Sequence, residues 1–150
     1  MDRKVDGFSL IELITVIAIL AIVLMVAMPM YREWIVKYRI ESNTKDIYSF
    51  LQKMRHKAFV EKVKLDVELS SNSLCVKCDS SDNTCKGIYG KGYISCIDLF
   101  NGFSGKTVNI SSRGTLNGGP IYYSKSNKAQ YDCVRVSDVR IRMDKCNGSP

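Results

Sequence analysis

The chain has 150 residues, a formal net charge of +7 and six cysteines. This length accommodates a membrane anchor and one modest folded domain. The positive charge is concentrated in residues 101–150, which contain eight basic and three acidic residues. A basic surface of this kind either binds a polyanion or only keeps the protein soluble.

The first thirty residues contain a long apolar segment behind a short polar leader. Residues 1–7 form the leader, and the apolar segment runs from Phe8 to Met28 and ends at Pro29. A helix of this length spans about 31 Å, which is enough to cross the hydrocarbon core of a bilayer. Glu12 lies inside the segment, where a carboxylate costs about 2.5–3.5 kcal/mol. A residue this costly indicates a function and needs a partner.

The sequence Gly-Phe-Ser-Leu-Ile-Glu-Leu-Ile at residues 7–14, followed by an apolar helix and Pro29, closely resembles the amino-terminal signature of type IV prepilins and type II secretion pseudopilins. The resemblance implies that a prepilin peptidase cleaves between Gly7 and Phe8 and that the new terminal Phe8 is N-methylated. It also implies that Glu12 pairs with the terminal amine of a neighbouring subunit during filament assembly.

Two other interpretations of the amino terminus explain less. A secretory signal peptide would carry a small-residue cleavage site after its apolar core, and none is evident here, since the glycine precedes the core. A plain membrane anchor explains the apolar run but explains neither Glu12 nor the Gly7-Phe8 pair.

The helical pattern continues beyond Pro29. Apolar residues recur at spacings of 7, 4, 3 and 4 and form one stripe of an amphipathic helix. They are Ile40, Ile47, Leu51, Met54 and Ala58. We expect one helix from Phe8 to about Lys62, kinked at Pro29 because proline removes a backbone hydrogen bond. His56, the only histidine, is expected on the surface of this helix.

After residue 62 the pattern changes to a period of two, with apolar and charged residues alternating from Val63 to Leu69. The remaining chain contains short strand-like segments between turns, one of them the glycine-rich segment 87–92. We expect further strands near residues 74–77, 93–97, 107–110, 121–124, 131–136 and 139–143. A long helix followed by strands predicts an α+β fold, with an antiparallel sheet packed on the helix.

This order predicts four parts of the chain. They are a cleaved leader at 1–7, a transmembrane or filament-core helix at 8–29, an amphipathic helix half at 30–62 and a disulfide-bonded, β-rich head at 63–150. The later motifs resemble the pseudopilin H and FimT branch of the superfamily. They include Gly92-Tyr93-Ile94, Ser-Arg-Gly-Thr at 112–115 and Cys-Val-Arg-Val-Ser at 133–137.

The resemblance implies a single-pass protein of the bacterial inner membrane, with its head in the periplasm or on the cell surface. Its partners would be other pilins or pseudopilins and the prepilin peptidase, in either a type II secretion system or a type IV pilus. The sequence contains no glycine-rich phosphate loop, nucleophile elbow or repeated acidic metal motif. We therefore expect no enzyme activity, catalytic residue, metal or cofactor.

The last predicted strand places Arg140 and Arg142 on one face, with guanidinium groups about 7 Å apart. This spacing suits successive phosphates of a nucleic acid. FimT-like minor pilins that bind DNA during natural transformation carry Gly-Arg-x-Arg here, but Val139 stands in the place of that glycine. Arg135 and Lys145 would extend the patch toward double-stranded DNA. The alternative is an ordinary solvated strand face.

All six cysteines follow residue 74, in the part that the anchor would leave outside the cytoplasm, where an even number indicates disulfides. Cys75-x-x-Cys78 also allows a redox site, and a zinc site of Cys75, Cys78, Cys85 and Cys96 is possible by residue type. We favour three disulfides, although the first two could be exchanged. They are Cys78–Cys85, closing a loop rich in serine and aspartate, Cys75–Cys96 and Cys133–Cys146.

Overall fold

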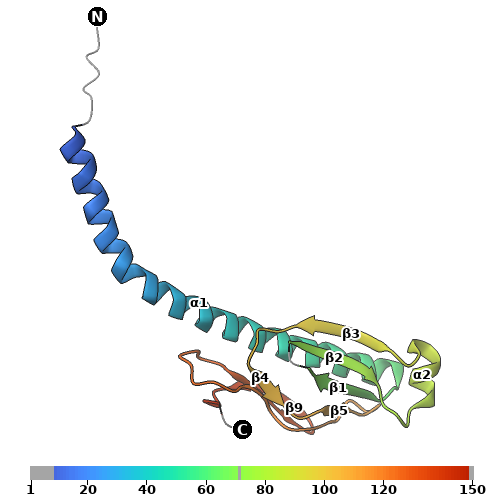
Figure 1. Cartoon of the computed structure of the whole chain (residues 1–150). Helices are drawn as coiled ribbons and strands as arrows, with labels where there is room; N and C mark the ends of the chain where they lie inside the picture. The colour runs from blue at the N-terminus through green and yellow to red at the C-terminus, as the bar shows by residue number, and fades with distance from the viewer. Residues whose placement is uncertain (1–8, 71, 149–150) are drawn as a thin grey trace, which may run out of the picture. The chain divides into compact units, whose positions relative to one another are not determined.

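A computed structural model describes residues 9–70 and 72–148. The chain divides into two compact units, residues 1–36 and 37–150, and the division falls within the first helix, α1 (Leu10–Glu61). Figure 1 shows this helix followed by the strands of the head. The predicted α+β fold, with a long amino-terminal helix and an antiparallel head, is therefore confirmed.

The described part of the first unit is the amino-terminal portion of α1. Every described side chain from residue 9 to residue 34 is exposed, although most of them are apolar. α1 is continuous through Pro29. By length and composition, α1 could cross a membrane. An apolar surface this extensive requires a lipid or protein environment.

In the second unit, the carboxyl-terminal portion of α1 contributes one face to the core. The five residues predicted to form its apolar stripe are all buried, together with Thr44 and Phe50. The Thr44 hydroxyl donates a hydrogen bond to the Ile40 carbonyl at 2.8 Å, so this buried polar group is satisfied. Lys62 ends the helix with a φ of 58°, and the Val63 N–H returns to the Ala58 carbonyl at 3.1 Å.

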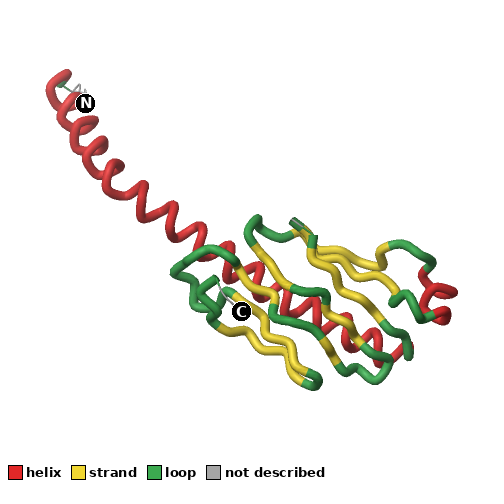
Figure 2. The backbone as a smooth tube through the Cα atoms, turned by 60° about the horizontal axis from the view of Figure 1, so that its bottom comes forward, coloured by secondary structure: helices red, strands yellow, loops and turns green. Residues whose placement is uncertain are grey.

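The described part of the head also contains two antiparallel sheets. Their orders are β3-β2-β1-β5-β6 and β4-β7-β8-β9. The strands are β1 (Leu65–Leu69), β2 (Ser73–Cys78), β3 (Tyr93–Asp98), β4 (Phe103–Gly105), β5 (Val108–Ile110), β6 (Leu116–Asn117), β7 (Ile121–Tyr123), β8 (Cys133–Ser137) and β9 (Arg140–Asp144). Figure 2 shows these strands in yellow beside the carboxyl-terminal portion of α1, drawn in red. Buried residues from both sheets and from α1 belong to one hydrophobic cluster.

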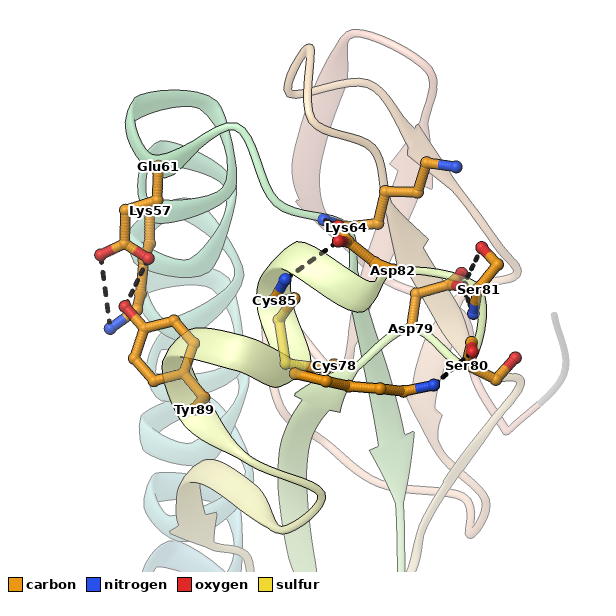
Figure 3. The surroundings of a disulfide bond; sticks show 11 residues. Lys57, Glu61, Lys64, Cys78, Asp79, Ser80, Ser81, Asp82, Cys85 and Tyr89 are labelled. Carbon is orange, nitrogen blue, oxygen red and sulfur yellow. Dashed lines mark hydrogen bonds and ion pairs between the residues drawn. A yellow bond between two sulfur atoms is a disulfide. The ribbon is translucent and has the colours of Figure 1, made fainter.

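The short helix α2 (Asn83–Tyr89) occupies the segment predicted to be a loop, so that prediction was wrong. Asp82 caps its amino terminus: the carboxylate accepts from the Cys85 N–H at 2.9 Å and from the Lys64 N–H at 2.6 Å (Figure 3). Hydrogen bonds from these two N–H groups hold the pKa of Asp82 below its usual value. The cap and the covalent link from Cys78 to Cys85 let a seven-residue helix form despite its glycine.

The side chain of Tyr89 connects α2 to α1. Its hydroxyl donates to the Glu61 carboxylate, as Figure 3 shows. The Lys57 ammonium lies 4.5 Å from the centre of the Tyr89 ring. The hydrogen bond with Tyr89 and the charge of Glu61 raise the pKa of Lys57, with burial opposing them. These contacts hold α2 against the carboxyl-terminal end of α1.

Candidate functional site

The hairpin of β8 and β9 carries the arginines singled out in the sequence. Ser137 and Arg140 are paired, so the connection consists of Asp138 and Val139. Two hydrogen bonds from distant segments fix this turn: the Leu116 N–H donates to the Asp138 carbonyl at 3.0 Å, and an Arg55 Nη donates to the Val139 carbonyl at 3.0 Å. The turn therefore has a defined position in the head.

Val139 stands before Arg140, where the Gly-Arg-x-Arg sequence of the FimT-like minor pilins has glycine, and its backbone shows no strain. Among the described residues, the only non-glycine residues with positive φ are Lys62 and Asn147, so Val139 does not occupy the left-handed region that favours glycine. Its side chain is 71% exposed. The turn thus accommodates valine, and β9 begins at Arg140, one residue later than predicted.

Three arginines share the exposed face of the hairpin. Arg135 lies directly opposite Arg142, and Arg140 is two residues from Arg142 on the same strand. Like charges directly opposite each other destabilise a sheet. Asp144 offsets part of this repulsion, because its carboxylate lies 3.1 Å from the Arg135 Nε. Within the described chain, Arg140 and Arg142 form no ion pair, so their charges are available to an external anion.

Arg135 and Arg142 also line a shallow surface depression together with Pro120, Val136 and Ser137. The depression brings guanidinium groups from two strands to one place on the surface. Because guanidinium groups bind phosphate and carboxylate groups in a bidentate manner, the arrangement can hold an oxyanion.

Lys145 does not belong to this arginine face. It follows β9 at an odd-numbered position and so lies on the side of Ile141 and Met143, which point inward. Its ammonium group lies 3.3 Å from the Asp132 carboxylate and donates to the Asn127 carbonyl at 3.0 Å. Lys145 therefore has a structural role, whereas the sequence analysis assigned it to the patch.

Asp132 is the centre of a buried polar network that the sequence analysis did not identify. The side chain is fully buried and accepts hydrogen bonds from the backbone N–H groups of Cys146 (2.6 Å) and Asn147 (3.1 Å). The Asn127 amide donates to it at 3.0 Å. Burial alone would raise the pKa of Asp132, but these hydrogen bonds and the charge of Lys145 outweigh burial and lower it. The network fixes the chain after β9 against the chain before β8.

The structure joins the same three pairs of cysteines that the sequence analysis favoured. Cys133–Cys146 closes the open end of the arginine hairpin, beside Asp132. Cys75–Cys96 connects residues that lie directly opposite each other on β2 and β3, and Cys78–Cys85 holds α2. All six cysteines lie in the described residues and none has a free thiol. In this disulfide-bonded state Cys75 and Cys78 offer no thiolate for zinc or for thiol exchange.

The residues expected to act in processing and assembly belong to the amino-terminal unit. Glu12 lies in the first turn of α1 and is exposed, surrounded in sequence by exposed apolar residues. Pro29 lies within α1. Gly7 and Phe8, where cleavage and methylation are expected, lie outside the described residues.

Comparison with known proteins supports this assignment of the amino terminus. Residues 2–28 match the family model described as the prokaryotic N-terminal methylation motif. No curated protein and no solved structure showed significant similarity to the chain. The motif supports a type IV pilin-like or pseudopilin precursor that a prepilin peptidase processes, and the apolar helix is consistent with a single-pass membrane anchor.

Proposed function

We propose that the chain is a minor pilin or pseudopilin, a structural subunit of a type II secretion system or a type IV pilus. The observation that carries the proposal is the methylation motif at residues 2–28, whose residues 10–28 form an exposed, mostly apolar part of α1. The helix anchors the precursor in the inner membrane and later packs against the helices of neighbouring subunits. The disulfide-bonded head then stands in the periplasm or on the cell surface, where oxidised cysteines persist.

Processing of the precursor tests this proposal. When the full chain is co-expressed with a prepilin peptidase, we expect a mature product that begins at Phe8 and carries one additional methyl group. Gly7→Val should block cleavage because its branched side chain occupies the position next to the scissile bond, whereas Val5→Ala should be processed normally. Intact mass spectrometry and amino-terminal sequencing measure both events. Cleavage after the apolar segment would instead identify a secretory signal peptide, and an uncleaved chain would identify a plain anchor.

A second candidate function is DNA binding by the head, as in FimT-like minor pilins that act in natural transformation. The observation that favours it is the exposed face of Arg135, Arg140 and Arg142, where Arg140 and Arg142 have no acidic partner among the described residues. Such a face would contact successive phosphates of double-stranded DNA and leave the bases unread.

This second function predicts binding that depends strongly on salt. We expect Arg140→Ala/Arg142→Ala to weaken the binding of the full-length mature chain, in nonionic detergent, to a DNA duplex. Losing two phosphate contacts should reduce the slope of log affinity against log salt by about 2. Fluorescence anisotropy at several salt concentrations measures this slope. Lys106→Ala/Lys125→Ala is the matched control, since it removes the same charge from exposed positions elsewhere in the head. Equal loss in both double variants, or no binding by the wild type, would remove this candidate.

A further inference from the structure

A hollow opens in the second unit between α1 and the turn formed by residues 111–115. It is lined by Gln52, Arg55, His56, Phe59, Arg113 and Gly114. Arg55, His56 and Arg113 are basic, and no acidic residue lines the hollow. These basic groups come from segments more than fifty residues apart in sequence, so the fold alone brings them together. The charges of Arg55 and Arg113 have no counter-charge within the lining.

Arg55 is held in place by neutral groups. Its Nε donates to the Gly114 carbonyl at 2.7 Å, and its Nη1 donates to the Val139 carbonyl at 3.0 Å. Within the described chain Arg55 forms no ion pair with a carboxylate. The guanidinium group is therefore oriented before any ligand arrives, retains its full charge and has further N–H donors to offer.

The turn that carries Arg113 is equally well defined. The Ser111 hydroxyl oxygen accepts from the N–H groups of Arg113 (3.3 Å) and Thr115 (3.2 Å), and the Gly114 N–H donates to the Ser111 carbonyl at 2.9 Å. Gly114 has a φ of 77°, and a Cβ built there would lie 3.5 Å from the Cβ of Phe59. The positive φ therefore favours glycine in this turn, whereas a Cβ would make only ordinary contact with α1, and the turn places Arg113 at the edge of the hollow.

Phe59 supplies an apolar wall and an additional cation lies beside it. Its side chain is 51% exposed, and the Lys62 ammonium lies 4.0 Å from the centre of its ring. The side-chain amide of Gln52 adds a neutral donor to the lining. The hollow therefore combines several hydrogen-bond donors, a surplus of positive charge and one aromatic surface.

We propose that this hollow binds a phosphate group, with Arg55, His56 and Arg113 as its ligands. A phosphate carries enough charge and enough acceptor oxygens to engage several cationic donors at once, whereas a carboxylate offers only two oxygens. The organic part of a phosphate ester would pack on Phe59. The hollow shares no lining residue with the depression beside Arg135 and Arg142, although Arg55 also donates to the Val139 carbonyl in the turn between β8 and β9.

The only histidine of the chain provides a selective probe of this site. We would label the full-length mature protein with ¹³C-histidine, in nonionic detergent, and titrate it with inorganic phosphate while sodium chloride keeps the ionic strength constant. The Cε1–H resonance of His56 should shift and saturate. Dimethyl phosphate, titrated in the same way, shows whether the site also accepts the phosphodiester of a nucleic acid or a lipid headgroup. Saturation with either phosphate compound supports the proposal.

Arg113→Gln is the informative variant, because Arg113 lies at the edge of the hollow and its side chain is exposed. Loss of one charged hydrogen-bond donor should weaken phosphate binding about tenfold or more. Arg142→Gln removes the same charge from the β8–β9 face and should leave the affinity unchanged. The proposal would be overturned by an absence of saturable shifts with both phosphate compounds, by an equal response to acetate, or by unchanged binding in Arg113→Gln. Arg55 is unsuitable for this test, since it also holds two backbone segments.

Discussion

Replacing Asp132 by alanine is expected to destabilise the head by about 3–5 kcal/mol, because the substitution leaves buried donors without an acceptor. Asp132 is fully buried, and its carboxylate receives the backbone N–H groups of Cys146 and Asn147. The carboxylate also accepts a hydrogen bond from the Asn127 amide and forms an ion pair with the Lys145 ammonium group. A single domain has a free energy of unfolding of only about 5–15 kcal/mol, so this loss would be a large part of the total.

Urea denaturation of the full-length chain in nonionic detergent, with its disulfides intact and followed by near-ultraviolet circular dichroism, measures the loss. Asp138→Ala is the matched control, since Asp138 lies exposed in the turn of the same hairpin and should change the free energy of unfolding by less than about 0.5 kcal/mol. If Asp132→Ala unfolded at the same urea concentration as Asp138→Ala, the network would not contribute to stability.

The pKa of Asp132 adds a pH dependence to the same prediction. Its pKa is lowered in the folded protein, so the folded state binds fewer protons at this site than the unfolded state does. The stability it contributes is present above the ordinary aspartate pKa of 3.8 and is lost as the pH falls through the lower, folded value. Asp132→Asn should therefore reduce the fall in stability below pH 3.8. Part of that fall should remain, because the pKa values of Asp79 and Asp82 are also lowered.

Replacing Glu12 by glutamine is expected to abolish assembly while leaving processing intact. This expectation rests on the proposed pilin function, in which the Glu12 carboxylate pairs with the terminal amine of a neighbouring subunit. Glutamine keeps the size of the side chain but removes its charge, so the neighbouring ammonium would be buried without a partner. Removing one member of a buried ion pair costs about 3–5 kcal/mol, a factor of more than a hundred in an association constant.

The same substitution should affect the membrane-inserted form in the opposite direction. A carboxylate in the apolar segment disfavours insertion, so neutralising Glu12 should favour the monomer in the bilayer. Chemical cross-linking in membranes that contain the complete secretion or pilus system would measure the oligomers formed, and mass spectrometry would verify cleavage before Phe8. Ser9→Ala, directly before the start of α1, is the control and should form oligomers normally. Oligomers of Glu12→Gln at the level of the wild type would show that the carboxylate is not needed for pairing.

Some features of this protein follow from residues that are near one another in sequence. The apolar run from Phe8 to Met28 and the buried stripe from Ile40 to Ala58 are local periodic patterns, so the long helix and its core-facing side could be predicted. The alternation from Val63 to Leu69 likewise indicated the first strand, which the structure places at Leu65–Leu69. Strands β4 and β6 were not predicted, because each is short and contains or adjoins a glycine. The equally short β5 and β7 were predicted, because they consist mainly of β-branched and aromatic residues.

The sequence by itself thus determined the amino-terminal apolar helix with its motif, the α+β order and the type of chemistry available on β9. Only the tertiary structure decided which basic groups remain available. Lys145 forms an ion pair with Asp132. Arg55 instead donates hydrogen bonds to the carbonyls of Gly114 and Val139, which lie 59 and 84 residues away in sequence. A backbone carbonyl is present at every residue and leaves no signal in the side-chain pattern, so such contacts cannot be read from spacing. The α2 cap was missed for a different reason: its contact between Asp82 and the Cys85 N–H is local, but a seven-residue segment that contains Gly87 has little helical pattern.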